Sequence, residues 1–179
     1  MLPEWNLHYA RWVIEDGEPE RNVGEVFDWF AITFWTERQL SAASDRTTSV
    51  VPVSDYQYRV VAEVTYLTDR ACIIDFGLGA TASSDLLPQG CKEGDYVTGE
   101  IYLNLPLCTE VGPDDVFKAL ARTWRVNRIS ADMTPYVPHP EYSGGLIRDA
   151  SHIRYQDVRS TDSVRTHTYV LHCSEVHPE

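Results

Sequence analysis

Residues 58–103 read YRVVAEVTYLTDRACIIDFGLGATASSDLLPQGCKEGDYVTGEIYL, and this stretch decides the fold. From Arg59 to Thr68 the residues on one face are Val60, Ala62, Val64 and Tyr66. This period of two is typical of a half-buried strand. The short polar segment Thr68-Asp69-Arg70 comes next, and Ala71 to Phe76 resumes as a second strand with an apolar centre. The two segments predict a tight β-hairpin.

Two further strands come after the hairpin. Gly77 and Gly79 bracket Leu78, where the chain can bend because glycine tolerates positive φ. Ala80 to Ser84 predicts a short third strand, and Tyr96 to Leu103 predicts a fourth, in which Gly99 indicates a bulge or a corner. Strands that bend in this way are how small barrels close, so we expect a β-barrel.

The pattern resembles an OB-fold barrel. In order, it has a strand, a turn, a second strand with a glycine after it, a loop that contains a serine, and the motif K-x-G-D-x-V-x-G-x-I. In particular it resembles the RNA-binding OB domains repeated in the largest protein of the bacterial small ribosomal subunit. The resemblance covers roughly a quarter of the chain, and the residues that carry it are Gly77, Ser84, Leu86, Lys92, Gly94, Asp95, Val97 and Ile101.

The resemblance implies a binding site that the sequence does not reproduce. That family stacks bases on aromatic rings near the start of its second strand and uses a histidine on its third. Here Ala71 and Cys72 open the second strand, and residues 81–83 are Thr-Ala-Ser. Tyr66 and Phe76 are the remaining aromatic candidates for a stacking platform, with a core role as the alternative for each.

We expect a single, mainly β domain over residues 1–179. Its parts would be an N-terminal hairpin at 1–36, an OB-like barrel at about 58–130, and a loop with a C-terminal hairpin at 131–179. Residues 122–130 return to strand periodicity and would close the barrel as its fifth strand. Gly112-Pro113-Asp114-Asp115 is a helix-start signal, which predicts a short helix at 113–121.

The net charge of −12 is unevenly distributed. Residues 1–121 carry 20 acids and 8 bases, whereas residues 122–179 carry 7 of each. A strongly acidic surface repels phosphate backbones and favours basic partners. The charge therefore favours a basic protein partner over a nucleic acid, with a merely solubilising surface as the alternative.

Several classes of protein are not expected from this sequence. No apolar run approaches the ~18–20 residues that a membrane span needs, and residues 1–16 lack the features of a secretory signal. We therefore expect a cytoplasmic protein. The cysteines Cys72, Cys91, Cys108 and Cys173 form no C-x-x-C pair, and free buried thiols are the expected state.

Two places in the chain raise the question of chemistry. Asp28 lies among aromatic residues and would be a candidate acid or base if buried, or a solvent-exposed or arginine-paired carboxylate otherwise. His167, His172 and His177 lie near Cys173, but His172 and His167 fall on opposite faces of a strand. We assign no catalytic residue, no metal and no cofactor.

Residues 131–145 are rich in proline and glycine and predict a long irregular loop. Such a loop in a compact domain is often a binding or lid element. Its Tyr136, His139 and Tyr142 therefore join Tyr66 and Phe76 as a candidate binding surface.

The sequence supports three functional hypotheses. The first is a non-enzymatic acidic β-barrel protein that binds a basic protein, such as an immunity or inhibitor-type protein for a bacterial nuclease. The second is an OB-type protein that binds single-stranded nucleic acid. The third is an enzyme with its site under the 131–145 loop.

Overall fold

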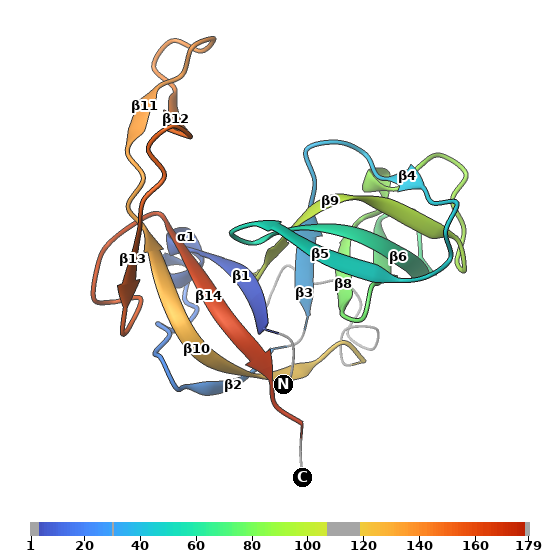
Figure 1. The fold of residues 1–179 in the computed structure, drawn as a ribbon, viewed down its shortest axis with the longest axis horizontal. Coiled ribbons are helices and arrows are strands. Elements are labelled where there is room, and N and C mark those ends of the chain that lie inside the picture. The colour runs from blue at the N-terminus through green and yellow to red at the C-terminus, as the bar shows by residue number, and fades with distance from the viewer. Residues whose placement is uncertain (1–3, 30, 107–118, 178–179) are drawn as a thin grey trace.

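The computed structural model describes residues 4–29, 31–106 and 119–177, and these residues are mainly β (Figure 1). The strands are β1 (Glu4–Ala10), β2 (Val26–Trp29), β3 (Ile32–Trp35), β4 (Ser41–Ala42), β5 (Ser49–Ser54), β6 (Gln57–Leu67), β7 (Ala71–Asp75), β8 (Gly79–Ser83), β9 (Tyr96–Asn104), β10 (Arg122–Asp132), β11 (Tyr136–Pro138), β12 (Leu146–Arg148), β13 (Tyr155–Val158) and β14 (Thr168–Glu175). The helical segments are α1 (Arg11–Glu15) and the 3-10 turn η1 (Ser84–Leu86). The predicted fold class, a mainly β protein with a small barrel, extra strands and one short helix, is confirmed.

Five strands close the barrel. The meander β6–β7–β8 is antiparallel, β8 pairs in parallel with β3, and β3 pairs antiparallel with β9, which returns to β6. The predicted hairpin is the β6–β7 pair, and the predicted third and fourth strands are β8 and β9. This closed five-stranded barrel is compatible with an OB-like barrel.

The strand that closes the barrel is not the one that the sequence predicted. Residues 122–130 do lie in a strand, β10, but β10 pairs with β13, β14 and β2. The fifth barrel strand is β3, whose Ile32 and Phe34 are buried. Residue alternation identifies a strand and its buried face, but it does not identify a partner far away in the sequence.

Two glycines shape the barrel through their lack of a side chain, although the pairing of β9 with β6 continues through Gly99 without the predicted bulge. Gly77 has a φ of +97° and turns the chain from β7 towards β8. Gly99 lies under Leu40, and a Cβ atom at this position would be 2.6 Å from the Leu40 Cδ2 atom. The glycine thus lets the segment before β4 pack closely onto β9.

Beyond the barrel the same sheet continues from β9 in the order β1-β14-β10-β13, with β2 on a further part of β10, and we call this part the second sheet. The two parts of the molecule meet where β1 runs parallel to β9, at the pair His8 and Asn104 (Figure 1). One face of this sheet carries the core residues Trp5, Leu7, Tyr9, Val126 and Leu171. They belong to the same buried cluster as the barrel interior, so the two parts share one core.

Both predicted terminal hairpins are wrong in their pairing. β1 pairs with β14 over seven residues, from Glu4 opposite Ser174 to Ala10 opposite Thr168, and not with β2 or β3. Within the predicted N-terminal hairpin at 1–36, residues 11–15 form the helix α1. β13 and β14 both pair with β10 rather than with each other. The terminal strands thus pair with each other or with β10, and these strand pairs join residues that are far apart in the sequence.

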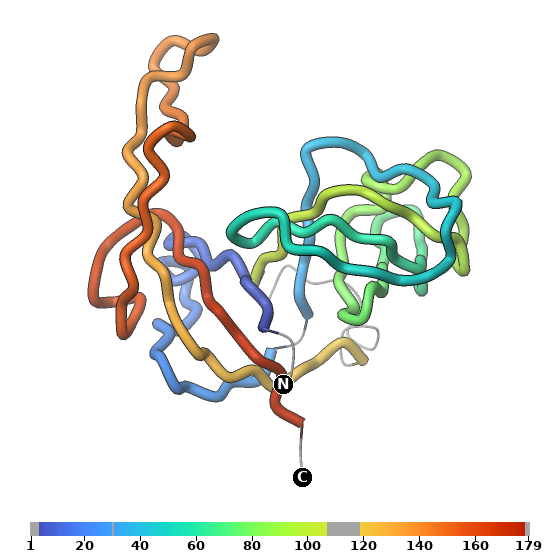
Figure 2. Tube along the Cα trace, viewed as in Figure 1, coloured from blue at the N-terminus to red at the C-terminus, as the bar shows by residue number. Residues whose placement is uncertain are grey.

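The segment 131–145 is partly regular. β11 and β12 pair antiparallel, from Tyr136 opposite Arg148 to Pro138 opposite Leu146, so the loop expected to be irregular includes the first strand of a short hairpin. Figure 2 shows this segment leaving the second sheet and returning to it as a projecting arm. We call residues 133–154 the arm. Most of the helix predicted at 113–121 lies outside the described residues.

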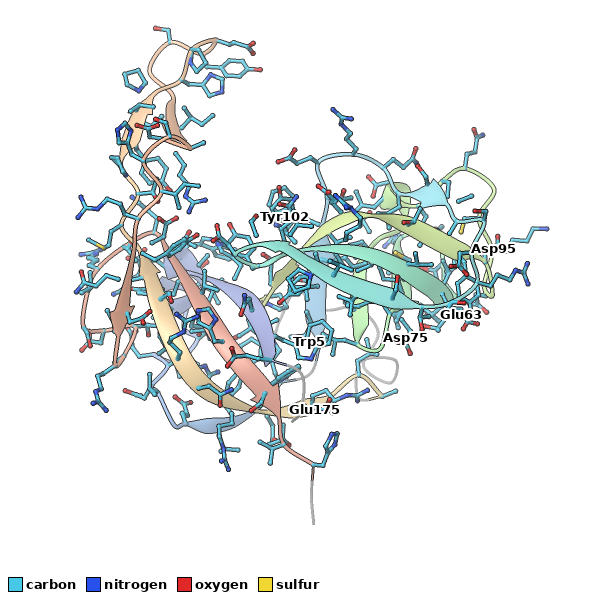
Figure 3. All side chains as sticks on the ribbon, viewed as in Figure 1. Trp5, Glu63, Asp75, Asp95, Tyr102 and Glu175 are labelled. Atoms are coloured by element: carbon cyan, nitrogen blue, oxygen red, sulfur yellow. The ribbon has the colours of Figure 1, made fainter. Side chains whose placement is uncertain are left out.

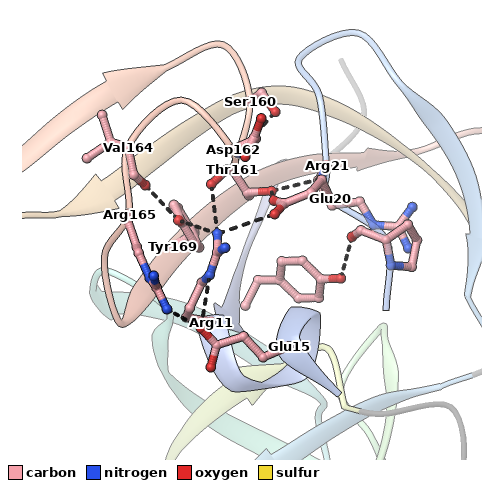
Figure 4. A network of polar contacts seen from close by, with 12 residues as sticks. Arg11, Glu15, Glu20, Arg21, Ser160, Thr161, Asp162, Val164, Arg165 and Tyr169 are labelled. Atoms are coloured by element: carbon pink, nitrogen blue, oxygen red, sulfur yellow. Dashed lines mark hydrogen bonds and ion pairs between the residues drawn. The ribbon is translucent and has the colours of Figure 1, made fainter. Parts of the chain in front are cut away.

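A polar network fastens the N-terminal loop to the loop before β14 (Figure 4). Arg11 Nη1 donates to Glu20 Oε1 (3.3 Å) and to the Thr161 carbonyl (3.4 Å). Thr161 Oγ1 donates to Glu20 Oε2 and accepts from the Arg21 backbone N–H (2.9 Å). Arg165 forms an ion pair with Glu15 at 3.0 Å.

Within the part of the chain that the structure describes, no helix has the length and apolar character that a membrane crossing requires.

Candidate functional site

The outward side chains of β6 and β9 form one continuous face on the barrel. Their inward neighbours, such as Val60 and Ile101, fill the core, so the alternate positions must point away from it. The pairs across this face are Gln57 with Tyr102, Arg59 with Glu100, Val61 with Thr98, and Glu63 with Tyr96. Trp35 of β3 lies opposite Tyr102, and Asp75 of β7 lies opposite Glu63. We call these ten residues the outer barrel face.

One end of the outer barrel face is acidic. Glu63 and Asp75 are directly opposed, and the Tyr96 hydroxyl donates to Glu63 Oε2 at 3.2 Å. Figure 3 shows Glu63, Asp75 and Asp95 at the same end of the barrel. Among the described residues, none of these three carboxylates forms an ion pair. Asp75 Oδ1 also accepts from the Gly77 backbone N–H at 2.8 Å. Like charges placed directly opposite each other on neighbouring strands destabilise a sheet, and these two hydrogen bonds offset only part of that cost.

The other end of the outer barrel face is aromatic. Trp35, which is 42% exposed, stacks on Tyr102 with a centroid separation of 4.1 Å and an angle of 10° between the rings. The Tyr102 hydroxyl donates to Glu37 Oε1 at 3.1 Å. Burial and this hydrogen bond raise the pKa of Tyr102 to about 12, so the hydroxyl stays protonated near neutral pH. Next to Tyr102 lies a pocket of about 520 Å³ that is lined also by Glu37, Gln57 and Glu100.

Three of the five residues predicted as a binding surface lie together on the arm. Tyr136, His139 and Tyr142 all belong to it, and the rings of His139 and Tyr142 are 4.6 Å apart. Tyr136 and Tyr142 are exposed. The arm also exposes Val137, Leu146 and Ile147, so an apolar surface runs along both of its strands.

The other two predicted residues lie on the barrel, away from the arm. Phe76 is 2% exposed and packs on Trp5, with ring centroids 6.0 Å apart. Its ring belongs to the core, which excludes a stacking platform on it. Tyr66 is half-buried near the end of β6, opposite Ile73.

A pocket of about 500 Å³ lies on the face of the second sheet that points away from the core. Its lining includes Asn6, Asp55, Arg128, Ser130, Asp157 and His172. Strand register brings these residues together, because Asn6 pairs with His172, His172 with Arg128, and Ser130 with Asp157. The β5–β6 turn reaches the pocket with Asp55, whose carbonyl accepts from Asn6 Nδ2 at 2.7 Å.

Two histidines on this sheet face are held neutral by their surroundings. Burial lowers the pKa of His8 to about 4, although Asn104 and Asp132 act in the opposite direction. Burial also lowers the pKa of His172, and the charge of Arg128 adds to this effect. Both imidazoles are therefore neutral near pH 7, and the lowered pKa makes each a weaker base than a free histidine.

A larger pocket of about 720 Å³ lies at the base of the arm, where the third hypothesis places an enzyme site. His8, Asp132, Tyr136 and His167 contribute to its lining. The rings of Tyr136 and His167 meet edge to face at 5.3 Å.

The remaining residues considered for chemistry are separated from one another. Asp28 is exposed on β2 and accepts a hydrogen bond from Thr123 Oγ1 at 2.6 Å. His167 lies beside Tyr136, His172 beside Ser130, and His177 is 3.9 Å from Glu175. Over residues 4–29, 31–106 and 119–177, no group of three His, Cys, Asp or Glu side chains is arranged to hold a metal ion.

The described cysteines are Cys72, Cys91 and Cys173, and each is a free thiol. Burial raises the pKa of Cys72 to about 12 and raises that of Cys173 further. These two thiols therefore pack as small apolar side chains.

Sequence reasoning did not identify Trp35, Tyr102 or the group Asn6, Ser130 and His172. A signal for the second group existed, since polar residues alternate with core residues in all three strands. The alternation does not show that β1, β10 and β14 pair with one another, and only this pairing brings the three residues together.

Comparison of the chain with protein-family models, with curated proteins and with solved structures finds no match.

Proposed function

We propose that the protein acts by binding a basic protein, as an immunity or inhibitor-type protein does, and that the partner docks on the outer barrel face. The observation that carries the proposal is the directly opposed pair Glu63 and Asp75, which has no cationic partner among the described residues. Arrangements that break a local stability rule are expected at functional sites, where a ligand supplies the missing interaction. Lysine or arginine side chains of a partner would supply it here.

The distribution of ion pairs supports the outer barrel face, rather than the second sheet, as the docking surface. There, five arginines are paired with acids: Arg11 with Glu20, Arg21 with Glu25, Arg122 with Glu175, Arg128 with Asp157, and Arg148 with Asp132. On the outer barrel face, as far as the described residues show, the one ion pair is Arg59 with Glu100, at 2.7 Å. Among the described residues, Glu63, Asp75 and Asp95 of the barrel are therefore not neutralised by an ion pair.

The aromatic end of the same face supports a protein partner. Tryptophan, tyrosine and arginine dominate the residues that contribute most to protein interfaces. Trp35 and Tyr102 present a pre-stacked pair beside the carboxylate of Glu37, and an arginine side chain can stack on such rings while it pairs with the acid. We place this interaction in the cytoplasm, where thiols such as Cys91 stay reduced.

Charge reversal on the outer barrel face is expected to abolish capture of the partner. Immobilised wild-type protein and the variant Glu63→Lys/Asp75→Lys would be incubated with extract of the cells that make the protein. We expect a basic protein to be retained by the wild type and lost from the variant. With the purified pair, we expect Kd to weaken at least ~10-fold, or about 1.4 kcal/mol, and to weaken further with added salt.

The matched control is Asp16→Lys/Asp162→Lys, which makes the same change in net charge on exposed loops of the second sheet. We expect this variant to retain the partner. Capture of the same basic protein by Glu63→Lys/Asp75→Lys with unchanged Kd would contradict the proposal, as would a partner that is acidic.

Short single-stranded RNA and DNA are expected not to bind at physiological salt. Residues 58–103 offer three bases against seven acids, whereas ordinary nucleic-acid binding uses roughly 6–10 phosphate contacts. Phe76 is in the core, so the family-like aromatic platform is reduced to Tyr66. Fluorescence polarisation of labelled oligonucleotides is the measurement. Micromolar binding that Tyr66→Ala weakens would instead support the OB-type alternative.

A further inference from the structure

The pocket on the second sheet contains a serine, a histidine and an asparagine in contact. Ser130 Oγ lies 3.0 Å from His172 Nε2, and His172 Nδ1 lies 2.7 Å from Asn6 Oδ1. The three residues come from β10, β14 and β1, so three rigid neighbouring strands fix their separation. They lie apart from the outer barrel face, so their chemistry does not depend on the basic partner.

The hydrogen bonds of Asn6 determine which nitrogen of His172 carries the proton. Asn6 Nδ2 donates to the Asp55 carbonyl at 2.7 Å, which orients Oδ1 of the same amide towards the imidazole. Since Oδ1 is an acceptor, we assign the proton to His172 Nδ1. Nε2 then carries a lone pair 3.0 Å from Ser130 Oγ, and it can accept the Ser130 proton once that proton is no longer donated to Asp157 Oδ1. This is the arrangement of nucleophile, base and orienting group that serine-dependent acyl transfer requires.

Two charged side chains compete within the same network. Ser130 Oγ donates its proton to Asp157 Oδ1 at 2.9 Å, and the donor Arg128 Nη2 lies 3.2 Å from His172 Nδ1. Both are more than half exposed, and they are 3.6 Å from each other, so they can pair in solvent. Ser130, His172 and Asn6 are the more buried members of the network, so we expect their contacts to remain when the outer pair opens.

We propose that Ser130, His172 and Asn6 form a catalytic site that transfers the acyl group of a small carboxylic ester to water. Ser130 Oγ attacks the ester carbonyl carbon while its proton passes to His172 Nε2. The bond from that carbon to the alcohol oxygen breaks, and the alcohol leaves with the proton from His172. Water then attacks the acyl-serine and gives its proton to His172, which returns it to Ser130 Oγ as the carboxylic acid leaves.

The rest of the pocket fits this chemistry and limits the substrate. Arg128 lines the pocket, and once its ion pair with Asp157 opens its guanidinium can stabilise an oxyanion formed on the substrate. A volume of about 500 Å³ accommodates a small ester. Asp55 and Asp157 on the walls favour an alcohol portion that is polar or cationic.

The test uses the full chain, a fluorophosphonate probe and 4-nitrophenyl acetate. We expect the probe to label Ser130, as located by mass spectrometry of the digested protein. Hydrolysis above the uncatalysed rate is expected to fall by ~100-fold or more in Ser130→Ala and His172→Gln, and less in Asn6→Ala. Ser174→Ala, on the same strand as His172, is the control and should keep the wild-type rate.

A variant that retains a nucleophile separates a catalytic role from a structural one. In Ser130→Cys, iodoacetamide should alkylate residue 130 at least ~10-fold faster than in Ser130→Cys/His172→Gln, because His172 assists thiolate formation. Absence of label on Ser130, with the same hydrolysis rate in wild type and Ser130→Ala, would overturn the proposal. If Ser130→Ala does not fold, equal alkylation rates in the two cysteine variants would overturn it.

Discussion

Replacing Arg21 by alanine is expected to lower the free energy of unfolding by about 3 kcal/mol or more, the loss typical of breaking a buried ion pair. Arg21 is 4% exposed, and its Nη1 lies 2.7 Å from Glu25 Oε1. The guanidinium carbon lies 4.1 Å from the centre of the Phe27 ring and 5.2 Å from that of Trp29. The variant loses the ion pair, the stacking and the volume of the side chain together.

The matched control is Arg59→Ala. Arg59 and Glu100 are also 2.7 Å apart, but the Arg59 side chain is 64% exposed, so we expect a loss below about 1 kcal/mol. Urea denaturation of both variants measures the difference. Equal losses of unfolding free energy in the two variants would show that burial does not determine how much these ion pairs stabilise the protein.

Acid is expected to destabilise the fold through His8. The pKa of His8 is about 4 in the folded protein and 6.5 ordinarily, so between these values the unfolded chain binds a proton that the folded protein does not. The stability that depends on neutral His8 is therefore fully present above pH 6.5 and is lost as the pH falls towards 4. Linkage gives a loss of about 2 kcal/mol between about pH 7 and pH 5.

The measurement is urea denaturation of the wild type and of His8→Gln at about pH 7, 6 and 5. Glutamine does not titrate and can still hydrogen-bond near Asn104 and Thr168. We expect the variant to lose less stability than the wild type over this range. The residual dependence includes His172, whose pKa is shifted in the same direction. The same pH dependence in both proteins would exclude His8 as its source.

The local parts of the fold were predictable from sequence. Alternation in residues 59–68 predicted that Val60, Ala62 and Val64 point inward, and they are buried. Gly77 was expected to permit a sharp bend and has a positive φ. These features depend on backbone sterics and on neighbours a few residues away, which the sequence displays directly.

The distant parts were not predictable from the same patterns. The partner of β1 is β14, with Asn6 opposite His172 across most of the chain. The closing strand β3 precedes the meander instead of following it. Alternation shows which residues of a strand point to each face, but it does not show which strand pairs with it. The closure of the barrel and the pocket on the second sheet both depend on pairs of strands that are distant in sequence.

The candidate binding site was predictable in its charge but not in its position. Counting residues placed the acidic excess in residues 1–121 and favoured a basic partner. It did not show that Glu63 and Asp75 are opposed, nor that Trp35 stacks on Tyr102, since both depend on strand register. The predicted aromatic residues Tyr136 and Tyr142 lie instead on the arm, which is a separate exposed surface.

Carboxyl footprinting of the isolated complex tests the outer barrel face most directly. Carbodiimide-driven labelling with glycine ethyl ester, read by mass spectrometry, reports the accessibility of each Asp and Glu with and without the partner. We predict that labelling of Glu63 and Asp75 falls several-fold in the complex, while that of Asp16 and Asp162 is unchanged. Unchanged labelling of Glu63 and Asp75, with protection appearing elsewhere on the molecule, would contradict the proposed docking surface.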